Sequence, residues 1–226
     1  MTTNDHQLHV LDHGYVRLVD FMGDDVSISR AARVSYDAPP RPEDRRLIAY
    51  LWENEHTSPF EAVTVTFEVM APIFVLRQWH RHRTQSYNEL SARYRELPDI
   101  YYTPALEEIT TQHSSNKQMR SDDANPMAED AQKLMDAACD ESFSAYRELL
   151  AMDVPRELAR IVLPVATYSH MFCTMNLLNL FRFLKLRVHE HAQYEIRVYA
   201  EAMLQLASEV APIACQAFTG QLEGEQ

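Results

Sequence analysis

Apolar and polar residues alternate strictly over residues 62–69. Val63, Val65, Phe67 and Val69 fall on one face, and smaller or polar residues fall on the other. This pattern predicts a half-buried strand, because successive side chains of a strand point to opposite sides of a sheet. Two more strands are expected, at residues 15–21 and, from a weaker pattern, 167–174.

Helical spacing of apolar residues predicts most of the remaining chain. Helices are expected near residues 27–34, over 42–53, after Pro72, from Ala131, after Pro155, over 176–186 and over 190–210. The helix from Ala131 should bury Leu134, Ala138, Tyr146 and Leu149. The run Pro39-Pro40-Arg41-Pro42 is expected to break the chain, and residues 110–128, rich in Ser, Thr, Asn, Gln and Asp, to form a mobile surface loop.

No repeat or linker divides the 226 residues, which are enough to bury a large core. We therefore expect one domain over residues 1–226, of the α/β (α+β) class, with an antiparallel or mixed sheet flanked by long helices. A Rossmann unit or a phosphate-binding P-loop is excluded, because each needs glycine where its backbone approaches a phosphate. The four glycines are Gly14, Gly23, Gly220 and Gly224.

A formal net charge of −12 argues against broad binding to nucleic acid or to an anionic membrane. The first residues lack the basic and apolar regions of a signal peptide, and no apolar run reaches the roughly 20 residues that span a bilayer. Three widely spaced cysteines, Cys139, Cys173 and Cys215, are expected to be reduced thiols of a cytoplasmic protein.

Positive charge is concentrated between Arg77 and Arg95. This stretch holds five arginines and a single carboxylate, Glu89, which leaves 21 − 5 = 16 basic and 33 − 1 = 32 acidic residues elsewhere. Such an excess of guanidinium groups indicates a pocket for a discrete anion, and we expect a phosphorylated small molecule. Taken alone, the cluster is equally compatible with a network of ion pairs at an interface.

The sequence segments around this cluster resemble those of the flavin-dependent thymidylate synthases. Arg81-His82-Arg83, seven further residues and then Ser91 are similar to the defining motif of that family. Other segments also resemble motifs of the family, in the same order and with compatible spacing, over roughly residues 27–218. They begin at His56, Ser86, Pro155 and Leu186. The resemblance implies reductive methylation of dUMP to dTMP. The expected cofactor is FAD, with 5,10-methylenetetrahydrofolate as the carbon donor, NADPH as the reductant, and a homotetramer with sites between subunits.

Residues are carried over from the family motifs position by position. The resemblance implies that dUMP is bound by Gln78, Arg81, Glu89, Leu90, Ser91, Ala92, Arg93, Arg160 and Arg187. It implies that FAD is bound by Ser58, Arg81, His82, Arg83, Glu89, Asn176, Leu177, Leu178 and Arg182, with His56 in a supporting role. The chain departs from some relatives at Leu178 and Arg182, so contacts at Leu177 and Leu178 are expected to come from the backbone.

Arg187 is the expected catalytic residue. A guanidinium beside N3 and O2 of uracil would stabilise charge pushed into the ring, which makes C5 more nucleophilic. Ser91 has no assigned base among its sequence neighbours and suits a ligand-positioning role better. None of the cysteines lies in a basic stretch that would activate a thiol.

Several alternatives stay open from the residues themselves. The chain could be a non-catalytic nucleotide-binding regulator on the same scaffold. It could also be a metal-dependent nucleotide hydrolase using His189, His191 and Glu195, although no metal site is expected because residues two apart do not share a helical face. Three aromatic residues could stack on a base or pack in the core, namely Trp79, Tyr87 and Tyr94. Three arginines are expected to be solvated or paired at the surface, namely Arg147, Arg156 and Arg197.

Overall fold

The computed structural model describes residues 7–34 and 44–224, with side chains up to residue 220. Its strands are β1 (Gln7–Val10), β2 (Gly14–Met22), β3 (Thr64–Pro72), β4 (Ser86–Glu89), β5 (Thr110–Gln112), β6 (Arg120–Ala124) and β7 (Tyr168–Asn176). Its α-helices are α1 (Asp25–Arg33), α2 (Arg45–Glu53), α3 (Ile73–Trp79), α4 (Ala128–Ala151), α5 (Arg156–Ala159), α6 (Leu177–Arg187), α7 (Tyr194–Val210) and α8 (Pro212–Gly224). Short 3₁₀ turns are η2 (Ser58–Ala62), η3 (Leu106–Glu108) and η4 (Arg160–Val162).

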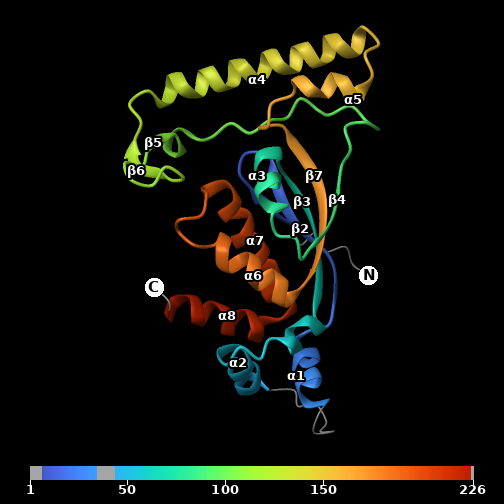
Figure 1. Cartoon of the computed structure of the whole chain (residues 1–226), viewed down its shortest axis with the longest axis vertical. Coiled ribbons are helices and arrows are strands. Elements are labelled where there is room, and N and C mark those ends of the chain that lie inside the picture. The colour runs from blue at the N-terminus through green and yellow to red at the C-terminus, as the bar shows by residue number, and fades with distance from the viewer. Residues whose placement is uncertain (1–6, 35–43, 225–226) are drawn as a thin grey trace.

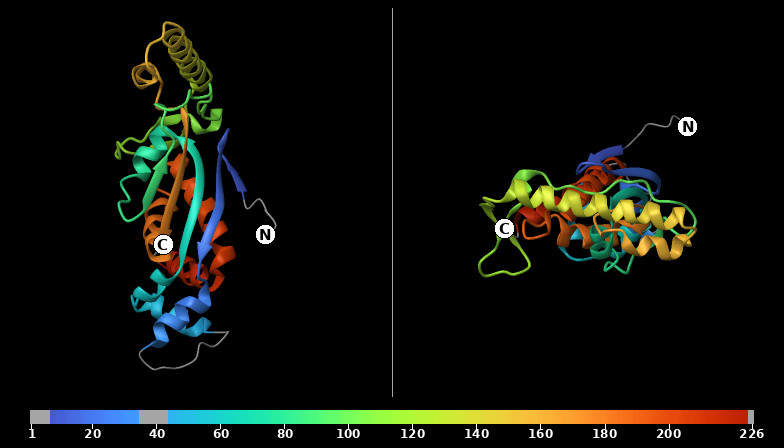
Figure 2. Two further views of the ribbon diagram at one scale, coloured as in Figure 1. Left: turned by 90° about the vertical axis from the view of Figure 1, so that its right-hand side faces the viewer. Right: turned by 90° about the horizontal axis from the view of Figure 1, so that it is seen from above.

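Five strands form one antiparallel sheet in the order β1-β2-β3-β7-β4. Helices α6 and α7 cover one face of this sheet (Figures 1 and 2). Helices α4 and α5 lie across one end of the sheet, and α1, α2 and α8 lie at the other end (Figure 1). The expected α+β class with a sheet flanked by long helices is therefore confirmed, and within the described residues every strand pair is antiparallel.

The core lies between the sheet and the helices α6 and α7. Val63, Val65, Phe67 and Val69 are fully buried on the inner face, as the alternation predicted. The strand itself begins at Thr64, because residues 58–62 form η2, and it continues to Pro72. Pro72 is the N-cap of α3, which begins at Ile73 as expected after a proline.

Helix α4 exists where we expected it, but its buried stripe differs from the prediction. Tyr146 is buried and Leu149 is partly buried, as predicted, but Leu134 is 72% exposed and Ala138 is also exposed, and their places are taken by Cys139 and Phe143. The first half of α4 contacts the extended segment 101–104 through polar groups: Tyr101 Oη donates to Asp140 Oδ1 at 2.8 Å, and Thr103 Oγ1 donates to Asp136 Oδ1 at 2.7 Å. That contact turns the apolar positions Leu134 and Ala138 away from the chain.

Residues 110–128 are not an irregular loop. Thr110–Gln112 and Arg120–Ala124 pair as the antiparallel hairpin β5–β6, so that part of the prediction is wrong, while mobility stays a prediction. The expected helix over 190–210 begins at Tyr194, after a turn. The Pro39–Pro42 break lies outside the described residues. No helix in the described ranges is long and apolar enough to cross a membrane.

Candidate functional site

A cavity of about 270 Å³ lies where the end of β4, the start of α3 and the η4 turn meet. It brings together four residues of the predicted dUMP set, from two distant parts of the chain: Glu89, Leu90, Ala92 and Arg160. Its wall is completed by residues of both kinds, apolar and polar: Ile73, Arg77, Leu97, Ile161, Leu163, Pro164, Val165 and Ser169. Apolar walls with a few polar groups are typical of small-molecule sites.

Glu89 is fixed in this cavity by its neighbours. Ser169 Oγ donates to Glu89 Oε1 at 2.7 Å, and His80 Nε2 lies 3.9 Å from Glu89 Oε2. The next residue, Leu90, leaves the strand with its N–H donated to the carbonyl of His170 at 2.7 Å. The carboxylate is therefore held at the cavity edge as an oriented hydrogen-bond acceptor.

Ser91 and Arg93 flank the cavity residue Ala92 in the turn after β4, but neither of them lines the cavity. The backbone N–H of Arg93 donates to Ser91 Oγ at 3.3 Å, and Arg93 Nε lies 3.9 Å from Glu157 Oε2 on α5. Ser91 has no histidine or other base bonded to it in the described residues, which agrees with a ligand-positioning hydroxyl. Arg93 is exposed, so its guanidinium is accessible to a phosphate.

A larger cavity, about 600 Å³, lies between α2 and α8. It contains none of the predicted site residues, and its lining is Arg45, Ala49, Glu53, Ile213, Gln216, Ala217 and Gly220. The larger of these two cavities is therefore not the one that contains the predicted site residues. We take the smaller cavity as the site, because it alone of the two combines two guanidinium groups with an oriented carboxylate.

Arg187, at the end of α6, meets His82 from the turn after α3. Arg187 Nε donates to His82 Nε2 at 3.0 Å, and the His82 ring packs edge-on to Phe183 with 4.8 Å between centroids. Burial, and after it the charge of Arg187, lowers the pKa of His82 to about 4. Burial also lowers the pKa of Arg187. His82 is therefore a neutral acceptor, with its proton on Nδ1.

The terminal nitrogens of Arg187 have no hydrogen bond or ion pair within the described part of the chain. A half-buried guanidinium without a carboxylate keeps its full charge and its free donors. Such a group can stabilise a negative charge or a carbonyl oxygen of a ligand. Arg187 does not line the 270 Å³ cavity of its own chain.

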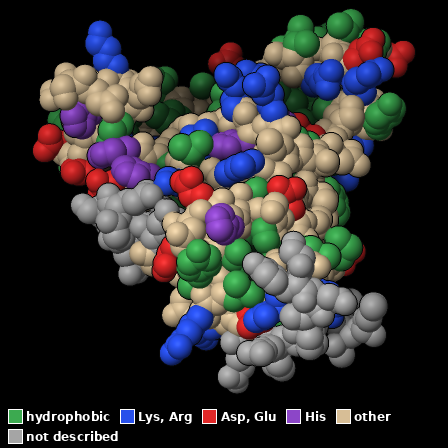
Figure 3. Space-filling view, turned by 60° about the horizontal axis from the view of Figure 1, so that its bottom comes forward, with side chains coloured by type: hydrophobic (Ala, Val, Ile, Leu, Met, Phe, Trp, Pro, Cys, Tyr) green, Lys and Arg blue, Asp and Glu red, His purple; other side chains and the backbone are tan. Residues whose placement is uncertain are grey.

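Other arginines of the motif face solvent. Arg81 and Arg83 are exposed in the turn between α3 and β4, and neither forms an ion pair in the residues that the structure describes. Gln78, one turn earlier, has a buried Oε1 without a partner. Figure 3 shows Lys and Arg side chains gathered near His side chains in the middle of one face of the molecule. The motif thus offers the guanidinium donors of Arg81 and Arg83, and Gln78 offers an acceptor, none of which has a partner in the described residues.

The residues predicted for FAD lie mainly at the other end of β7. Asn176 caps α6 by accepting from the N–H of Asn179 at 2.9 Å, and Asn179 Oδ1 accepts from Arg182 Nη1 at 3.3 Å. Ser58 is exposed at the start of η2, which is tied to α6 because Leu177 N–H donates to the carbonyl of Val63 at 2.8 Å.

Two members of that set are buried. Leu177 is 0% exposed and its N–H already donates to the carbonyl of Val63, so neither its side chain nor its N–H is available to a ligand. Leu178 is also buried and can offer only its backbone, in the first turn of α6. His56 is exposed, with its ring centroid 6.0 Å from that of Tyr50.

The dUMP cavity and the FAD residues at the start of α6 are well separated within one chain, although Arg81 and Glu89 belong to both predicted sets. Asn176 and Ser169 are seven positions apart on β7, which corresponds to about 23 Å at the usual rise of a strand. The FAD residues at the α6 start and the cavity at the η4 turn therefore lie at opposite ends of this strand.

The residues assigned from the sequence leave out two groups that line the cavity, Ser169 and Arg77, and one group near it, His80. Ser169 donates to Glu89, and His80 Nε2 lies 3.9 Å from Glu89 Oε2. Arg77 belongs to the basic stretch from which an anion pocket was expected, but it was not assigned to dUMP; it lies on α3, whereas Arg81 lies in the turn after that helix. Ser169 carries no local signal, since its role depends on the pairing of β4 with β7.

The three aromatic residues that could stack on a base or pack in the core have different surroundings. Trp79 is fully buried and stacks on Phe183 with 5.0 Å between centroids, so it belongs to the core. Tyr87 Oη donates to the backbone carbonyl of His82 at 2.7 Å and so supports the motif turn. Tyr94 is 81% exposed.

Cysteine chemistry is disfavoured by burial. All three cysteines are free and buried. Burial raises the pKa of Cys173 to about 12 and that of Cys215 to about 12, so these thiols stay protonated near neutral pH. Surface pairing of the three remaining arginines is confirmed: Arg147 pairs with Asp99, Arg156 with Glu96, and Arg197 with the backbone carbonyl of Glu190 and with Glu201.

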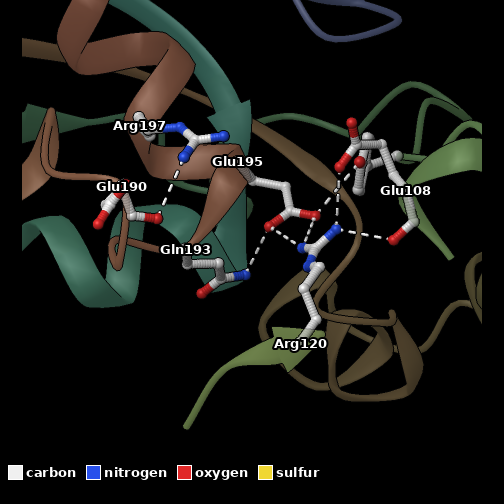
Figure 4. A network of polar contacts seen from close by, with 7 residues as sticks. Glu108, Arg120, Glu190, Gln193, Glu195 and Arg197 are labelled. Atoms are coloured by element: carbon white, nitrogen blue, oxygen red, sulfur yellow. Dashed lines mark hydrogen bonds and ion pairs between the residues drawn. The ribbon is translucent and has the colours of Figure 1, made fainter. Parts of the chain in front are cut away.

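Glu195 is engaged by protein groups rather than by a metal (Figure 4). Arg120 Nη2 from the β5–β6 hairpin donates to both carboxylate oxygens, at 2.6 and 2.8 Å, and Gln193 Nε2 donates at 2.8 Å. Arg120 Nη1 also contacts the carbonyl and the carboxylate of Glu108. Among the described residues, no group of three His, Cys, Asp or Glu side chains is arranged to hold a metal ion.

The chain is similar to proteins of one family over most of its length. The family model described as "Thymidylate synthase complementing protein" matches residues 17–213. The chain is 46% identical over 218 residues to a "Flavin-dependent thymidylate synthase" of Treponema denticola, covering 95% of this chain and 82% of that protein. It is 48% identical over 211 residues to one of Thermus thermophilus, covering 92% of this chain and 77% of that protein.

A solved structure shares the fold and a third of the sequence. The "UMP/dUMP methylase PolB from Streptomyces cacaoi bound with 5-Br dUMP" superposes with a TM-score of 0.84 at 34% identity, covering 94% of this chain and 97% of that one. Together with the family model, which spans most of the chain, these matches establish its relationship. The chain belongs to the flavin-dependent thymidylate synthase family.

Proposed function

We propose that the 270 Å³ cavity takes dUMP in the reaction of this family, the flavin-dependent methylation of dUMP to dTMP. One observation carries the proposal: Arg160 lines the same cavity as Glu89, Leu90 and Ala92, although it lies about seventy residues further along the sequence. We take 5,10-methylenetetrahydrofolate as the carbon donor and NADPH as the reductant.

The phosphate of dUMP would be bound by the cations around this cavity. Arg77 and Arg160 line it, and Ser91 and Arg93 flank the lining residue Ala92. A phosphate dianion favours several charge-assisted donors, and an arginine pair with a hydroxyl supplies them. The apolar wall of Leu90, Ala92 and Leu97 would cover the nucleoside.

Arg187 would act on the uracil ring. C5 attacks a one-carbon unit more readily when the ring has lost the N3 proton, because the negative charge is then shared by N3, the ring carbonyls and C5. A guanidinium with free terminal nitrogens stabilises that charge without losing its own proton. The group is already oriented by His82, so little reorganisation is needed as charge develops.

The residues present fit FAD, an anionic dinucleotide. Arg81, Arg83 and Arg182 are exposed cations, and neither motif arginine is neutralised by a carboxylate of the described chain. Since the chain has four glycines and no glycine-rich loop, side chains and the α6 start would hold the diphosphate. His82, Glu89, Ser58, Asn176 and the Leu178 backbone complete the proposed set, from which Leu177 is removed. Reduced FAD supplies the hydride for the transferred carbon.

A complete site would be assembled between subunits of a homotetramer. Two observations support this: Arg187 lies outside the dUMP cavity of its own chain, and the FAD residues at the start of α6 lie about 23 Å from that cavity along β7. One subunit would supply the cavity with Arg160, and another would supply Arg187 above the base. A cytoplasmic location, with reduced thiols, is part of the same proposal.

The visible spectrum of the purified protein tests this function. We expect flavin bands that bleach with NADPH under anaerobic conditions and return in air, and dTMP formation from dUMP and methylenetetrahydrofolate. A protein that takes up no FAD on titration would contradict the proposal and favour a regulator. Activity lost to a chelator would favour a metal-dependent hydrolase instead.

A matched variant tests the catalytic residue. Arg187→Ala is expected to lower dTMP formation by at least about a hundredfold, the usual effect of removing a group that stabilises transition-state charge. FAD retention should change much less. Arg197→Ala, an arginine of the next helix paired at the surface, is the control and should keep near-normal turnover.

A further inference from the structure

The partner of Arg187 is unusual in its charge. Arginines in proteins commonly pair with carboxylates, and this chain has 33 acidic residues available. Arg187 instead donates its Nε to an imidazole, and no carboxylate contacts it within the described residues. A carboxylate there would hold the guanidinium equally well but would cancel much of its charge. A neutral acceptor orients the group and leaves the charge intact.

His82 is itself held so that its Nε2 faces Arg187. Its ring packs edge-on to Phe183, one turn before Arg187 on α6, and its backbone carbonyl accepts from Tyr87 Oη at 2.7 Å. Its backbone N–H donates to the carbonyl of Trp79 at 2.9 Å, and Trp79 is stacked on Phe183 in the core. The imidazole is therefore fixed to the same packed cluster that fixes the end of α6.

We propose that His82 is a positioning residue for the reaction: a neutral acceptor that aims Arg187 at the uracil ring without neutralising its charge. This inference rests on the proposed catalytic role of Arg187 and adds what orients that residue. It predicts that the charge at position 82, and not only its hydrogen-bonding capacity, controls how well the bound uracil ring carries negative charge.

The replacement of His82 by Gln or by Glu separates these two properties. Both side chains can accept from Arg187 Nε, but only Glu adds a negative charge. The probe is 5-fluoro-dUMP bound to the FAD-loaded enzyme, and the fluorine NMR shift is followed against pH to find where N3 of the bound ring ionises. This readout needs no turnover. His113→Gln, at the tip of the hairpin, is the matched control.

For the wild type and His82→Gln, we expect the same ionisation midpoint within about twofold in the acid constant. His82→Glu should raise the midpoint by about one pH unit, a tenfold change, because its carboxylate opposes the ring anion. Equal midpoints for the Gln and Glu variants would overturn the inference.

A double-mutant cycle on turnover separates orientation through Arg187 from a direct role of His82. His82→Ala should slow dTMP formation in the wild type but have little further effect in an Arg187→Ala background, because residues that act as a unit are not additive. Equal effects in both backgrounds would overturn the inference. If Arg187→Ala itself leaves the ionisation midpoint unchanged, the proposed role of Arg187 fails, and that result is distinct from a failure at His82 alone.

Discussion

Asp25 accepts a hydrogen bond from the backbone N–H of Ala214 at 2.9 Å, although 189 residues separate them. Its second oxygen accepts from Ile213 N–H at the same distance. The carboxylate of α1 therefore satisfies the free N–H groups at the start of α8, and it is mostly buried. This contact joins the first and last helices at one end of the sheet.

Asp25→Ala is expected to lower the free energy of unfolding by about 1–3 kcal/mol, because two buried N–H groups lose their acceptor. Denaturant titration measures this change. Glu141→Ala, an exposed change on α4, is the control and should stay within about 0.5 kcal/mol of the wild type. An Asp25→Ala protein as stable as that control would show that water replaces the carboxylate.

Gly14 lies where no side chain fits. A Cβ there would be 2.6 Å from the carbonyl oxygen of Val10 and 2.8 Å from that of Met70. Since backbone must move to relieve these contacts, Gly14→Ala should lower stability by about 2 kcal/mol or more. Gly220→Ala is the opposite case: apart from its chain neighbours and the backbone of its own helix, α8, no atom lies within 4 Å of the added carbon, so stability should rise by up to about 1 kcal/mol. Thermal unfolding of the two variants checks the contrast in sign.

The Arg120–Glu195 pair anchors the β5–β6 hairpin to the start of α7 (Figure 4). Arg120→Met leaves the buried Glu195 carboxylate without its counter-ion, and we expect a loss of about 2–3 kcal/mol. Adding Glu195→Leu should restore much of it, because an apolar pair needs no counter-charge. Equal stability of the single and double variants, measured by urea titration, would contradict this account.

His82 should make stability depend on pH. Its pKa in the folded protein is about 4, below the usual histidine value of about 6.5, because burial and Arg187 disfavour the imidazolium. The stabilisation by the neutral ring is therefore complete above about pH 6.5 and is lost as the pH falls through about 4. Between about pH 7 and 4.5 the wild type should lose more unfolding free energy than His82→Gln. Parallel curves for the two proteins would contradict the assigned pKa direction.

The elements with strong local patterns could be predicted from the sequence. β3 has strict alternation, and α3 follows a proline. β1, β4 and α8 were not predicted. β4 is the polar run Ser86–Glu89, whose strand form depends on pairing with β7. α8 begins at Pro212, and its first N–H groups depend on Asp25, which is far away in the sequence.

The candidate site shows the same division. The motif arginines, Glu89 and Ser91 were predicted by resemblance because their spacing is local. Two hydrogen bonds could not be predicted from the sequence. Ser169 and Glu89 are 80 residues apart, and Arg187 and His82 are 105 residues apart, so only the folded chain brings each pair together. The wrong prediction for Leu134 has a similar cause: the face that α4 turns to the chain is chosen by polar contacts with Tyr101 and Thr103.

The most direct test of the central claim is subunit complementation between Arg160→Ala and Arg187→Ala. Each variant alone should make almost no dTMP. If a site takes Arg160 from one subunit and Arg187 from another, random mixed oligomers hold both residues in about a quarter of their sites, so dTMP formation should recover toward that fraction of wild type. A mixture as inactive as its parents, in variants that still bind FAD and exchange subunits, would contradict a site shared between chains.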